Sequence, residues 1–488
     1  VDLSQLLSNQ CNPILVSSEG RYVWCATSCV VTGHSDGRVT ATGRDVQTGV
    51  HSGEGHGTLA GAFRAAATGR LPDPLMLTAP QYNLWIECCY WPTQFAVLEY
   101  AKKVLEHGMP PGVIMIDTNW ALHYGSFEFN RTRFPDPSAM TSELHRMGFK
   151  VMLWVTPFVS PDSITFRYAE AKNFLVKGPE GETGVCRWWD GYSALLDTLN
   201  PNAVRWFEEG LEGLTAIGVD GFKMDGGDPE YFAQITGQGI PESLEYTEAF
   251  AALGLRYGLV EYRACWKQAG THLVQRLCDK NHAWDSSGLA SLIPNGIAQG
   301  ISGYAFGCPD MIGGGQYSDF YEVGTLEPHL DVDQELFVRY AQVSALFPMM
   351  QFSLAPWRVL DAEHLEACVE AANLHAELGE HILGLAKHAA ETGEPILRCM
   401  EYVFPHQGYA EVQDQFMLGS CVLVAPIATR GSAARTVRVP PGSWEGRGAA
   451  SHLPRVQGPA DVEVEAPVGA EGTAVEMTRL IWFSKREE

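Results

Sequence analysis

A lysine and an aspartate two residues apart end an apolar stretch near the middle of the chain, within residues 218–228. Side chains alternate along a strand, so Lys223 and Asp225 point to the same side. Gly226 and Gly227 follow, and their small size leaves room for a ligand to approach the carboxylate. A neighbouring ammonium keeps a carboxylate ionised, as a nucleophile requires. The spacing therefore predicts a nucleophile at Asp225, with a structural Lys–Asp pair as the alternative.

A second candidate carboxylate lies in residues 276–288, a polar segment that follows another apolar stretch. Asp285 stands beside Trp284 in this segment. An apolar ring and a nearby anionic Asp225 would both raise the pKa of Asp285 and keep it protonated. We therefore expect Asp285 to act as a general acid, and we interpret Asp279 of the same segment as an ordinary loop or surface residue.

Asp117 and Trp120 are a third candidate group, in residues 116–120, where Asp117 ends another apolar stretch. Asp117 could accept hydrogen bonds from sugar hydroxyls, and Trp120 could stack on a sugar face, although core packing is the commoner fate of a tryptophan. The chain has 13 tryptophans, including the pair Trp188–Trp189, which is compatible with a carbohydrate site. Two carboxylates across a sugar are the minimum for glycoside hydrolysis. These residues therefore predict a candidate glycosidase.

Alternating strands and helices must position these residues. Between about 81 and 390 the pattern repeats as apolar strand, polar loop and amphipathic helix, with candidate strands at 83–88, 113–117, 151–156, 221–225, 273–277 and 302–306, and candidate helices at 92–107, 137–147, 201–217 and 333–346. Such alternation over 250 or more residues indicates a parallel sheet and fits an α/β fold of the (β/α)8 TIM-barrel class. A doubly wound open sheet is the rival, but no Gly-rich phosphate turn follows residues 83–88.

The two ends of the chain have a different pattern. Residues 1–80 carry short alternating segments such as 22–25 and 38–42, which predict a small N-terminal β region, and the proline-containing stretch 71–74 marks its boundary. A helix is expected over 361–389. Short segments at 421–425, 436–439 and 462–464 then predict a C-terminal β-sandwich over residues 391–488.

Composition excludes several classes of partner. The net charge of −24 repels phosphate backbones and anionic lipid headgroups, so neither nucleic acid nor a membrane is expected as a partner. The 12 cysteines include no C-x-x-C pair and no signal peptide is visible, which favours a reducing, cytoplasmic location. A metal-dependent hydrolase is not indicated, because it should carry a His-x-His pair at a strand end and the sequence contains none. A homo-oligomer is left open.

Several ordered motifs resemble glycoside hydrolase family 31. The segment 220–225 is similar to that family's nucleophile strand, 307–315 to its Asp-Ile-Gly-Gly motif through Asp310, and 416–426 to the entry of its C-terminal sandwich. The resemblance implies a retaining hydrolase of α-linked sugars, with Asp225 as nucleophile and Asp285 as acid/base. It implies no metal or organic cofactor and a small oligosaccharide or glycoside as substrate. The residues implied to bind or enclose the sugar are Asp117, Lys223, Arg276, Trp154, Trp189 and Trp284.

The chain departs from the α-glucosidase pattern of that family at two places. Those enzymes usually carry Trp where this chain has Lys223, and an Arg-x-His where it has Gln351-Phe352-Ser353. Lys-x-Asp at the nucleophile, together with residues 187–191, is similar to α-galactosidases of the family, so galactose is the preferred sugar. Another α-glycosidase such as an α-glucosidase, a transglycosidase, and a sugar-binding protein without catalysis are the alternatives. The presence of both Asp225 and Asp285 argues against the last.

Overall fold

Eight parallel strands form the centre of the molecule. The computed structural model describes residues 12–25, 29–43, 46–50, 57–64, 71–323, 327–466 and 479–486. The strands follow the order β15-β14-β13-β12-β8-β7-β6-β16. A parallel bridge between Met311 and Gln351 joins the two ends of this sheet and closes it into a barrel. In chain order the barrel strands are β6 (Gln81–Asn83), β7 (Val113–Ile116), β8 (Lys150–Val155), β12 (Gly221–Met224), β13 (Leu259–Tyr262), β14 (Val274–Arg276), β15 (Gly307–Cys308) and β16 (Gln351–Phe352).

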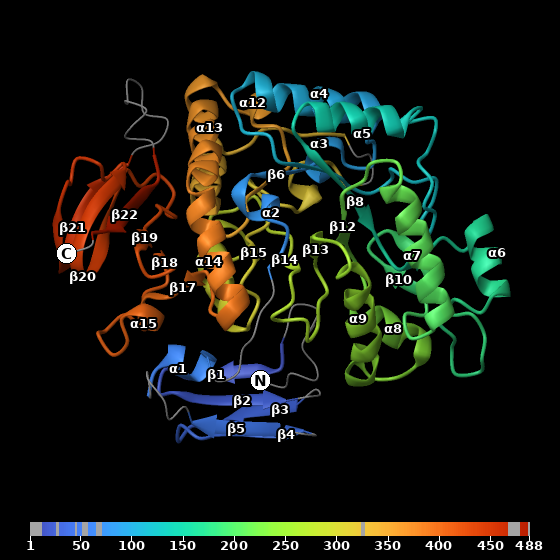
Figure 1. The fold of residues 1–488 in the computed structure, drawn as a ribbon, viewed down its shortest axis with the longest axis horizontal. Coiled ribbons are helices and arrows are strands. Elements are labelled where there is room, and N and C mark those ends of the chain that lie inside the picture. The colour runs from blue at the N-terminus through green and yellow to red at the C-terminus, as the bar shows by residue number, and fades with distance from the viewer. Residues whose placement is uncertain are drawn as a thin grey trace.

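Helices surround the barrel (Figure 1). Several begin at a side chain that accepts a hydrogen bond from the first turn, as Thr93, Asp136, Asn200 and Asp333 do, and two of these helices also start with proline. The connection between β13 and β14 contains no helix. The helices between and after the strands are α3 (Trp85–Cys88), α4 (Gln94–Glu106), α5 (Pro137–Arg146), α6 (Ile164–Ala171), α7 (Pro201–Thr215), α8 (Pro229–Thr236), α9 (Ile240–Gly254), α10 (Leu292–Ile301), α11 (Gln334–Ser344), α12 (Pro356–Val359), α13 (Ala362–Glu377) and α14 (Gly379–Thr392).

The predicted barrel is confirmed, with corrections to individual elements. The strand expected at 83–88 ends at Asn83 and gives way to the short helix α3, and the strand expected at 302–306 is wrong because the barrel strand begins only at Gly307. Strand β13 was not predicted, and β16 was located only through the family resemblance, at Gln351-Phe352-Ser353. The single helix expected over 361–389 is two helices, α13 and α14. Short barrel strands of two to four residues carry too little periodic signal to be recognised reliably.

Antiparallel sheets flank the barrel. The N-terminal region forms two small sheets, one of β1 (Ile14–Val16), β2 (Arg21–Cys25) and β5 (Val46–Val50) and one of β3 (Cys29–Gly33) and β4 (Val39–Gly43). The C-terminal β domain lies beside α13 and α14 (Figure 1). It is a six-stranded sheet of β17 (Leu397–Arg398), β18 (Phe416–Leu418), β19 (Val422–Val424), β22 (Ile481–Lys485), β20 (Ala434–Gly448) and β21 (Val456–Glu465), in that spatial order.

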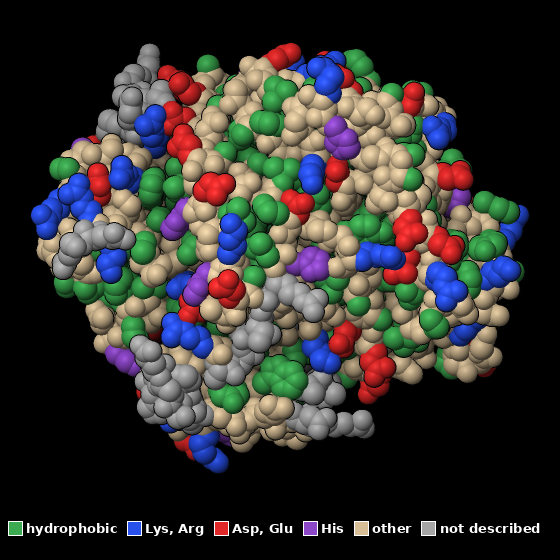
Figure 2. Space-filling view, viewed as in Figure 1, with side chains coloured by type: hydrophobic (Ala, Val, Ile, Leu, Met, Phe, Trp, Pro, Cys, Tyr) green, Lys and Arg blue, Asp and Glu red, His purple; other side chains and the backbone are tan. Residues whose placement is uncertain are grey.

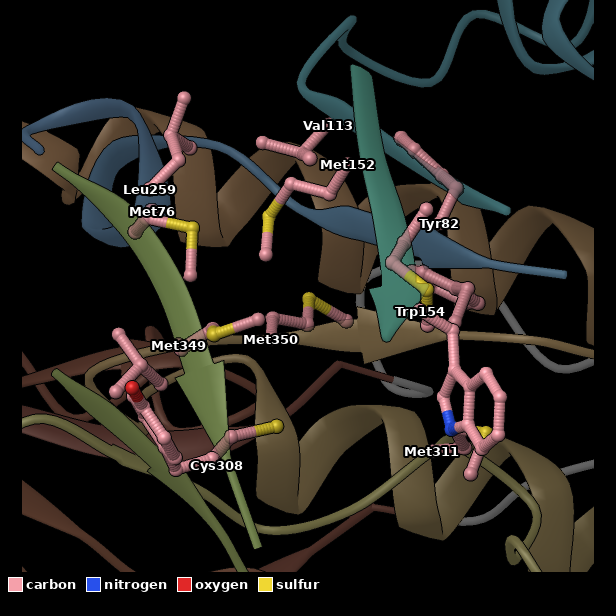
Figure 3. Packing of buried hydrophobic residues seen from close by; sticks show 14 of the residues in the cluster. Met76, Tyr82, Val113, Met152, Trp154, Leu259, Cys308, Met311, Met349 and Met350 are labelled. Carbon is pink, nitrogen blue, oxygen red and sulfur yellow. The ribbon is translucent and has the colours of Figure 1, made fainter. Parts of the chain in front are cut away.

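The barrel strands supply the main hydrophobic core. Flexible methionine side chains such as Met152, Met349 and Met350 lie between the strands and fill irregular space (Figure 3). On the face of the molecule shown in Figure 2, acidic and basic side chains are interspersed rather than gathered by sign. In the described part of the chain, no helix is both long enough and apolar enough to cross a membrane.

Candidate active site

A cavity of about 320 Å³ opens where the barrel strands end. This is the end of a TIM barrel where functional groups gather. The side chains around it are a mixture of aromatic rings, carboxylates and cations. They are Trp85, Tyr90, Asp117, Thr118, Trp154, Trp189, Lys223, Asp225, Tyr231, Arg263, Arg276, Asp279, Gln316 and Tyr317.

Asp225 lies at the end of β12 and is held as an anion. The indole Nε1 of Trp154 donates to Asp225 Oδ2 at 2.7 Å, and the Lys223 ammonium lies 4.0 Å from the same oxygen. Burial alone would raise the pKa of Asp225, but the charges of Lys223, Arg263 and Arg276 and the Trp154 hydrogen bond lower it to about 2. A buried carboxylate that stays ionised can attack an electrophilic carbon.

Lys223 of β12 lies between two carboxylates, Asp117 at the end of β7 and Asp225 at the end of its own strand. Its Nζ donates to Asp117 Oδ2 at 2.8 Å, and Asp117 Oδ1 accepts the backbone N–H of Thr118 at 2.8 Å. Both side chains of the pair are buried, with exposed fractions of 4% and 6%. Burial lowers the pKa of Lys223, but the negative charges of Asp117 and Asp225 outweigh burial. The pKa is therefore raised above its usual value, and the ammonium stays protonated. The cavity therefore has a fixed cation beside the candidate nucleophile.

Arg276 stands among three carboxylates at the end of β14. Its Nη1 lies 2.6 Å from Asp279 Oδ1 and 2.8 Å from Asp310 Oδ1, and its Nε lies 3.3 Å from Glu261 Oε1. Gln351 donates to the other oxygen of Glu261 at 2.8 Å. Burial raises the pKa of Asp310 to about 7, with Arg276 lowering it and Asp279 raising it. Asp310 therefore holds a proton up to near neutral pH.

The structure contradicts the prediction for Asp285 and Trp284. Asp285 is exposed and does not line the cavity, and hydrogen bonds from the Ser287 side chain and backbone lower its pKa instead of raising it. The Trp284 indole points to Asp333 at the start of α11, with Nε1 donating to Oδ2 at 2.9 Å. Asp285 lies nine residues beyond the end of β14, and the loop turns away over that length. Asp279, only three residues beyond the strand, remains at the cavity.

The other predicted residues have mixed positions. Trp154 and Trp189 line the cavity, and Trp189 is 45% exposed. Trp120 is buried outside the cavity wall, where its Nε1 donates to the Trp154 carbonyl at 2.7 Å and supports that residue from behind. Asp310 also lies outside the cavity lining and acts on it through Arg276. These two positions correct the expectation that all of the predicted residues contact the substrate.

Arg263 was missed by the sequence reasoning. It follows β13 directly, lies over the Trp189 ring at 4.7 Å, and contacts the buried Asp228 at 3.2 Å. The apolar pair Leu259–Val260 is the signal that could have revealed this strand and the polar residue after it. The cavity also gains aromatic residues from helices and turns outside the barrel strands, namely Trp85, Tyr90, Tyr231 and Tyr317.

Among the described residues, no group of three or more His, Cys, Asp or Glu side chains is arranged to hold a metal ion.

Strand β16 contributes no side chain to the cavity lining. Gln351 is turned into the barrel, where its Nε2 also donates to Gln81 Oε1 at 2.6 Å, and Ser353 accepts the Ile86 backbone N–H at 2.7 Å. The cavity therefore lacks the His that α-glucosidases of the resembled family carry near this strand.

Comparisons with known proteins agree with this architecture. A relative in Mus musculus, the myogenesis-regulating glycosidase, is 32% identical over 386 residues, which are 77% of this chain and 53% of the relative. Alpha-glucosidase 2 of Bacillus thermoamyloliquefaciens is 26% identical, over 77% of this chain and 50% of that protein. The chain thus spans about half the length of these relatives.

The fold is shared with solved structures at lower identity. A family 31 dextranase of Flavobacterium johnsoniae complexed with glucose superposes with a TM-score of 0.81 at 19% identity, covering 97% of this chain and 60% of that one. A family 31 alpha-xylosidase from a soil metagenome, complexed with xylose, has a TM-score of 0.80 at 21% identity and covers 98% and 73%. Residues 74–378 match the glycosyl hydrolases family 31 TIM-barrel domain, and residues 393–471 match the family 31 C-terminal domain. The chain belongs to glycosyl hydrolase family 31.

Proposed function

We propose that this protein is a retaining α-glycoside hydrolase in which Asp225 is the nucleophile and Asp279 is the acid/base. The observation that carries the proposal is that both carboxylates line one cavity, in opposite electrostatic surroundings. Asp225 is surrounded by cations and stays ionised, whereas Asp279 shares Arg276 with two further carboxylates. Glycoside hydrolysis needs two carboxylates at one cavity, of which one is the ionised nucleophile and the other exchanges a proton with the leaving group.

The proposed reaction is a double displacement. Asp225 attacks the anomeric carbon while Asp279 gives its proton to the leaving glycosidic oxygen, and a covalent glycosyl intermediate forms. Asp279 then removes a proton from water, which attacks the same carbon and releases Asp225. The Asp279 side chain is 37% exposed, so it is open to the water that this second step consumes. In this proposal Asp117, Lys223 and Arg276 bind sugar hydroxyls, and Trp154 and Trp189 enclose the ring.

We further propose galactose as the sugar that is cleaved. Lys223 occupies the place where the α-glucosidases of the family usually carry Trp, and its Nζ is at the cavity wall beside Asp117 and Asp225. An ammonium donates to a hydroxyl that a tryptophan ring would exclude. The relative with 32% identity is itself named a glycosidase. The lining has no His from β16, which separates this cavity from the glucose-type arrangement.

A panel of p-nitrophenyl α-glycosides tests the sugar, with the galactoside, glucoside, N-acetylgalactosaminide and xyloside compared by kcat/KM. The α-galactoside should be turned over fastest. Dominant turnover of the α-glucoside would refute the sugar assignment and leave the mechanism standing.

Two matched variants test the acid/base assignment. Asp279→Ala should lose roughly 100- to 10,000-fold in kcat on a substrate with a poor leaving group, the usual contribution of a general acid. Azide should restore part of the rate with an activated substrate by attacking the glycosyl intermediate without needing a base. Asp285→Ala removes a carboxylate from the same loop outside the cavity and should leave the rate near that of the unmodified protein. The reverse result would return the role to Asp285.

A further inference from the structure

The loop that carries Asp279 is attached to two other segments by one histidine. Nδ1 of His282 lies 2.7 Å from the carbonyl oxygen of Gly313, and Nε2 lies 3.0 Å from the backbone nitrogen of Asp333. The backbone N–H of His282 donates to Asp319 Oδ2 at 2.7 Å. His282 thus connects the loop after β14, the glycine segment after β15 (Gly313–Gly315) and the start of α11.

These contacts require a neutral imidazole. The backbone N–H of Asp333 can only donate, so Nε2 must accept, and the carbonyl of Gly313 can only accept, so Nδ1 carries the hydrogen. Protonation of Nε2 would place two N–H groups against each other. Burial lowers the pKa of His282, against the opposing effects of the Gly313 hydrogen bond and the charges of Asp333 and Asp319. The Phe320 ring packs against the imidazole at 5.4 Å and carries no charge.

Asp333 is a firm point of attachment for this loop. Its Oδ1 accepts the Leu336 backbone N–H at 3.1 Å and so caps α11, while its Oδ2 accepts from the Trp284 indole at 2.9 Å. Arg430, from the connection between β19 and β20, lies 3.3 Å from the same carboxylate. The contact from His282 therefore ties the Asp279 loop to a capped helix end rather than to another loop.

On the other side, the same loop lies directly against the glycine segment. Gly315 and Gln316 both donate their backbone N–H to the Lys280 carbonyl at 3.0 Å, and a Cβ on Gly314 would come within 2.7 Å of that oxygen. The Lys280 backbone N–H donates to Asp310 at 2.7 Å. Since Asp279 immediately precedes Lys280, a displacement of this stretch moves the carboxylate.

We propose that His282 is a positioning residue for the general acid, holding Asp279 in the orientation needed to reach the leaving oxygen. The inference rests on the proposed acid/base role of Asp279. The contacts of His282 hold the loop from two sides, with Gly313 on the side of the barrel and Asp333 on the side of α11. A shift of about 1 Å in a reacting group costs roughly 100-fold in rate, so releasing these contacts affects the step that Asp279 catalyses.

Leaving-group dependence tests the proposal. His282→Ala should lower kcat/KM, which reports the first displacement, about 10- to 100-fold on a disaccharide, whose leaving group needs protonation. The loss in kcat/KM should be several-fold smaller on a 2,4-dinitrophenyl glycoside of the same sugar, because that leaving group departs without an acid, while hydrolysis of the common intermediate does not enter kcat/KM. His282→Gln offers an acceptor toward Asp333 and His282→Asn offers a donor toward Gly313, so each should restore part of the lost rate. These two variants also carry the test if the alanine variant does not fold.

Two further variants separate the outcomes. His364→Gln removes a histidine that lies 2.8 Å from Asp361 at the start of α13, a comparable contact away from the cavity, and it should leave both substrates unaffected. Asp279→Ala provides the leaving-group dependence expected when the acid itself is lost. If Asp279→Ala shows that dependence and the His282 variants lose both substrates equally or lose neither, the positioning role is refuted alone. If Asp279→Ala shows none, the acid assignment fails, and the His282 proposal fails with it.

Discussion

Replacing Lys223 with methionine should move the acid limb of the pH–rate profile by several pH units. The ammonium lies 4.0 Å from Asp225 Oδ2 in a buried setting. At an effective dielectric constant of about 20, two unit charges at that separation interact by about 4 kcal/mol. One pKa unit corresponds to about 1.4 kcal/mol, so this interaction amounts to about 3 units. Removing the cation should therefore raise the pKa of Asp225 from about 2 to roughly 5.

The measurement is kcat/KM as a function of pH, because its acid limb reports the nucleophile of the free enzyme. The unmodified protein should keep its activity down to the lowest pH at which it stays folded. Lys223→Met should lose activity below about pH 5, in line with the raised pKa. Circular dichroism at each pH separates this titration from unfolding.

A double variant guards against a side effect of the substitution. Lys223→Met alone leaves the buried Asp117 without the ammonium that lies 2.8 Å from it, and repulsion from Asp117 would add to the shift. Lys223→Met combined with Asp117→Asn removes both charges together. It should still show an acid limb well above that of the unmodified protein. An unchanged limb in both variants would mean that Lys223 does not control the ionisation of Asp225, and the electrostatic reasoning would be wrong.

Three further results are expected. Asp225→Asn should abolish turnover without unfolding the protein, as initial rates and a thermal melt would show, and near-normal rates would mean that the nucleophile is misplaced. Gly314→Ala should lower the free energy of unfolding by roughly 1–3 kcal/mol in a denaturant titration, because its φ is +109° and a Cβ would meet the Lys280 carbonyl at 2.7 Å. Burial raises the pKa of Asp310 from 3.8 to about 7, so the folded state binds more protons in that interval and stability should fall as pH rises through it. Asp310→Asn should flatten this part of the stability–pH curve, and an unaltered slope would count against the raised pKa.

The barrel could be predicted because its apolar strands and amphipathic helices alternate over more than 250 residues. Strands β7, β8 and β12, each with four or more buried residues, were placed to within a few residues. Strands β15 and β16 have only two residues each, and their pairing depends on the closure of the barrel rather than on a local pattern. Strand β13 carries a buried Glu261 between apolar residues, which weakens its apolar signal.

The sequence predicted those functional side chains that lie at the end of a barrel strand. Asp117, Lys223, Asp225 and Arg276 lie at or next to a strand end, and all of them line the cavity. Beyond a strand end, the course of the loop decides which side chain faces the cavity. In the loop after β14 that course depends on contacts to residues far away in the sequence, such as Asp333.

The charges around the cavity suggest why two similar carboxylates would take different roles. At Asp225 three cations and an indole N–H act on one carboxylate, and its proton is lost well below neutral pH. At Arg276 three carboxylates, Asp279, Asp310 and Glu261, gather around one guanidinium, and burial raises the pKa of Asp310 to about 7. Asp279 is the only one of these three carboxylates that lines the cavity, which is why we propose it, rather than Asp310 or Glu261, as the acid.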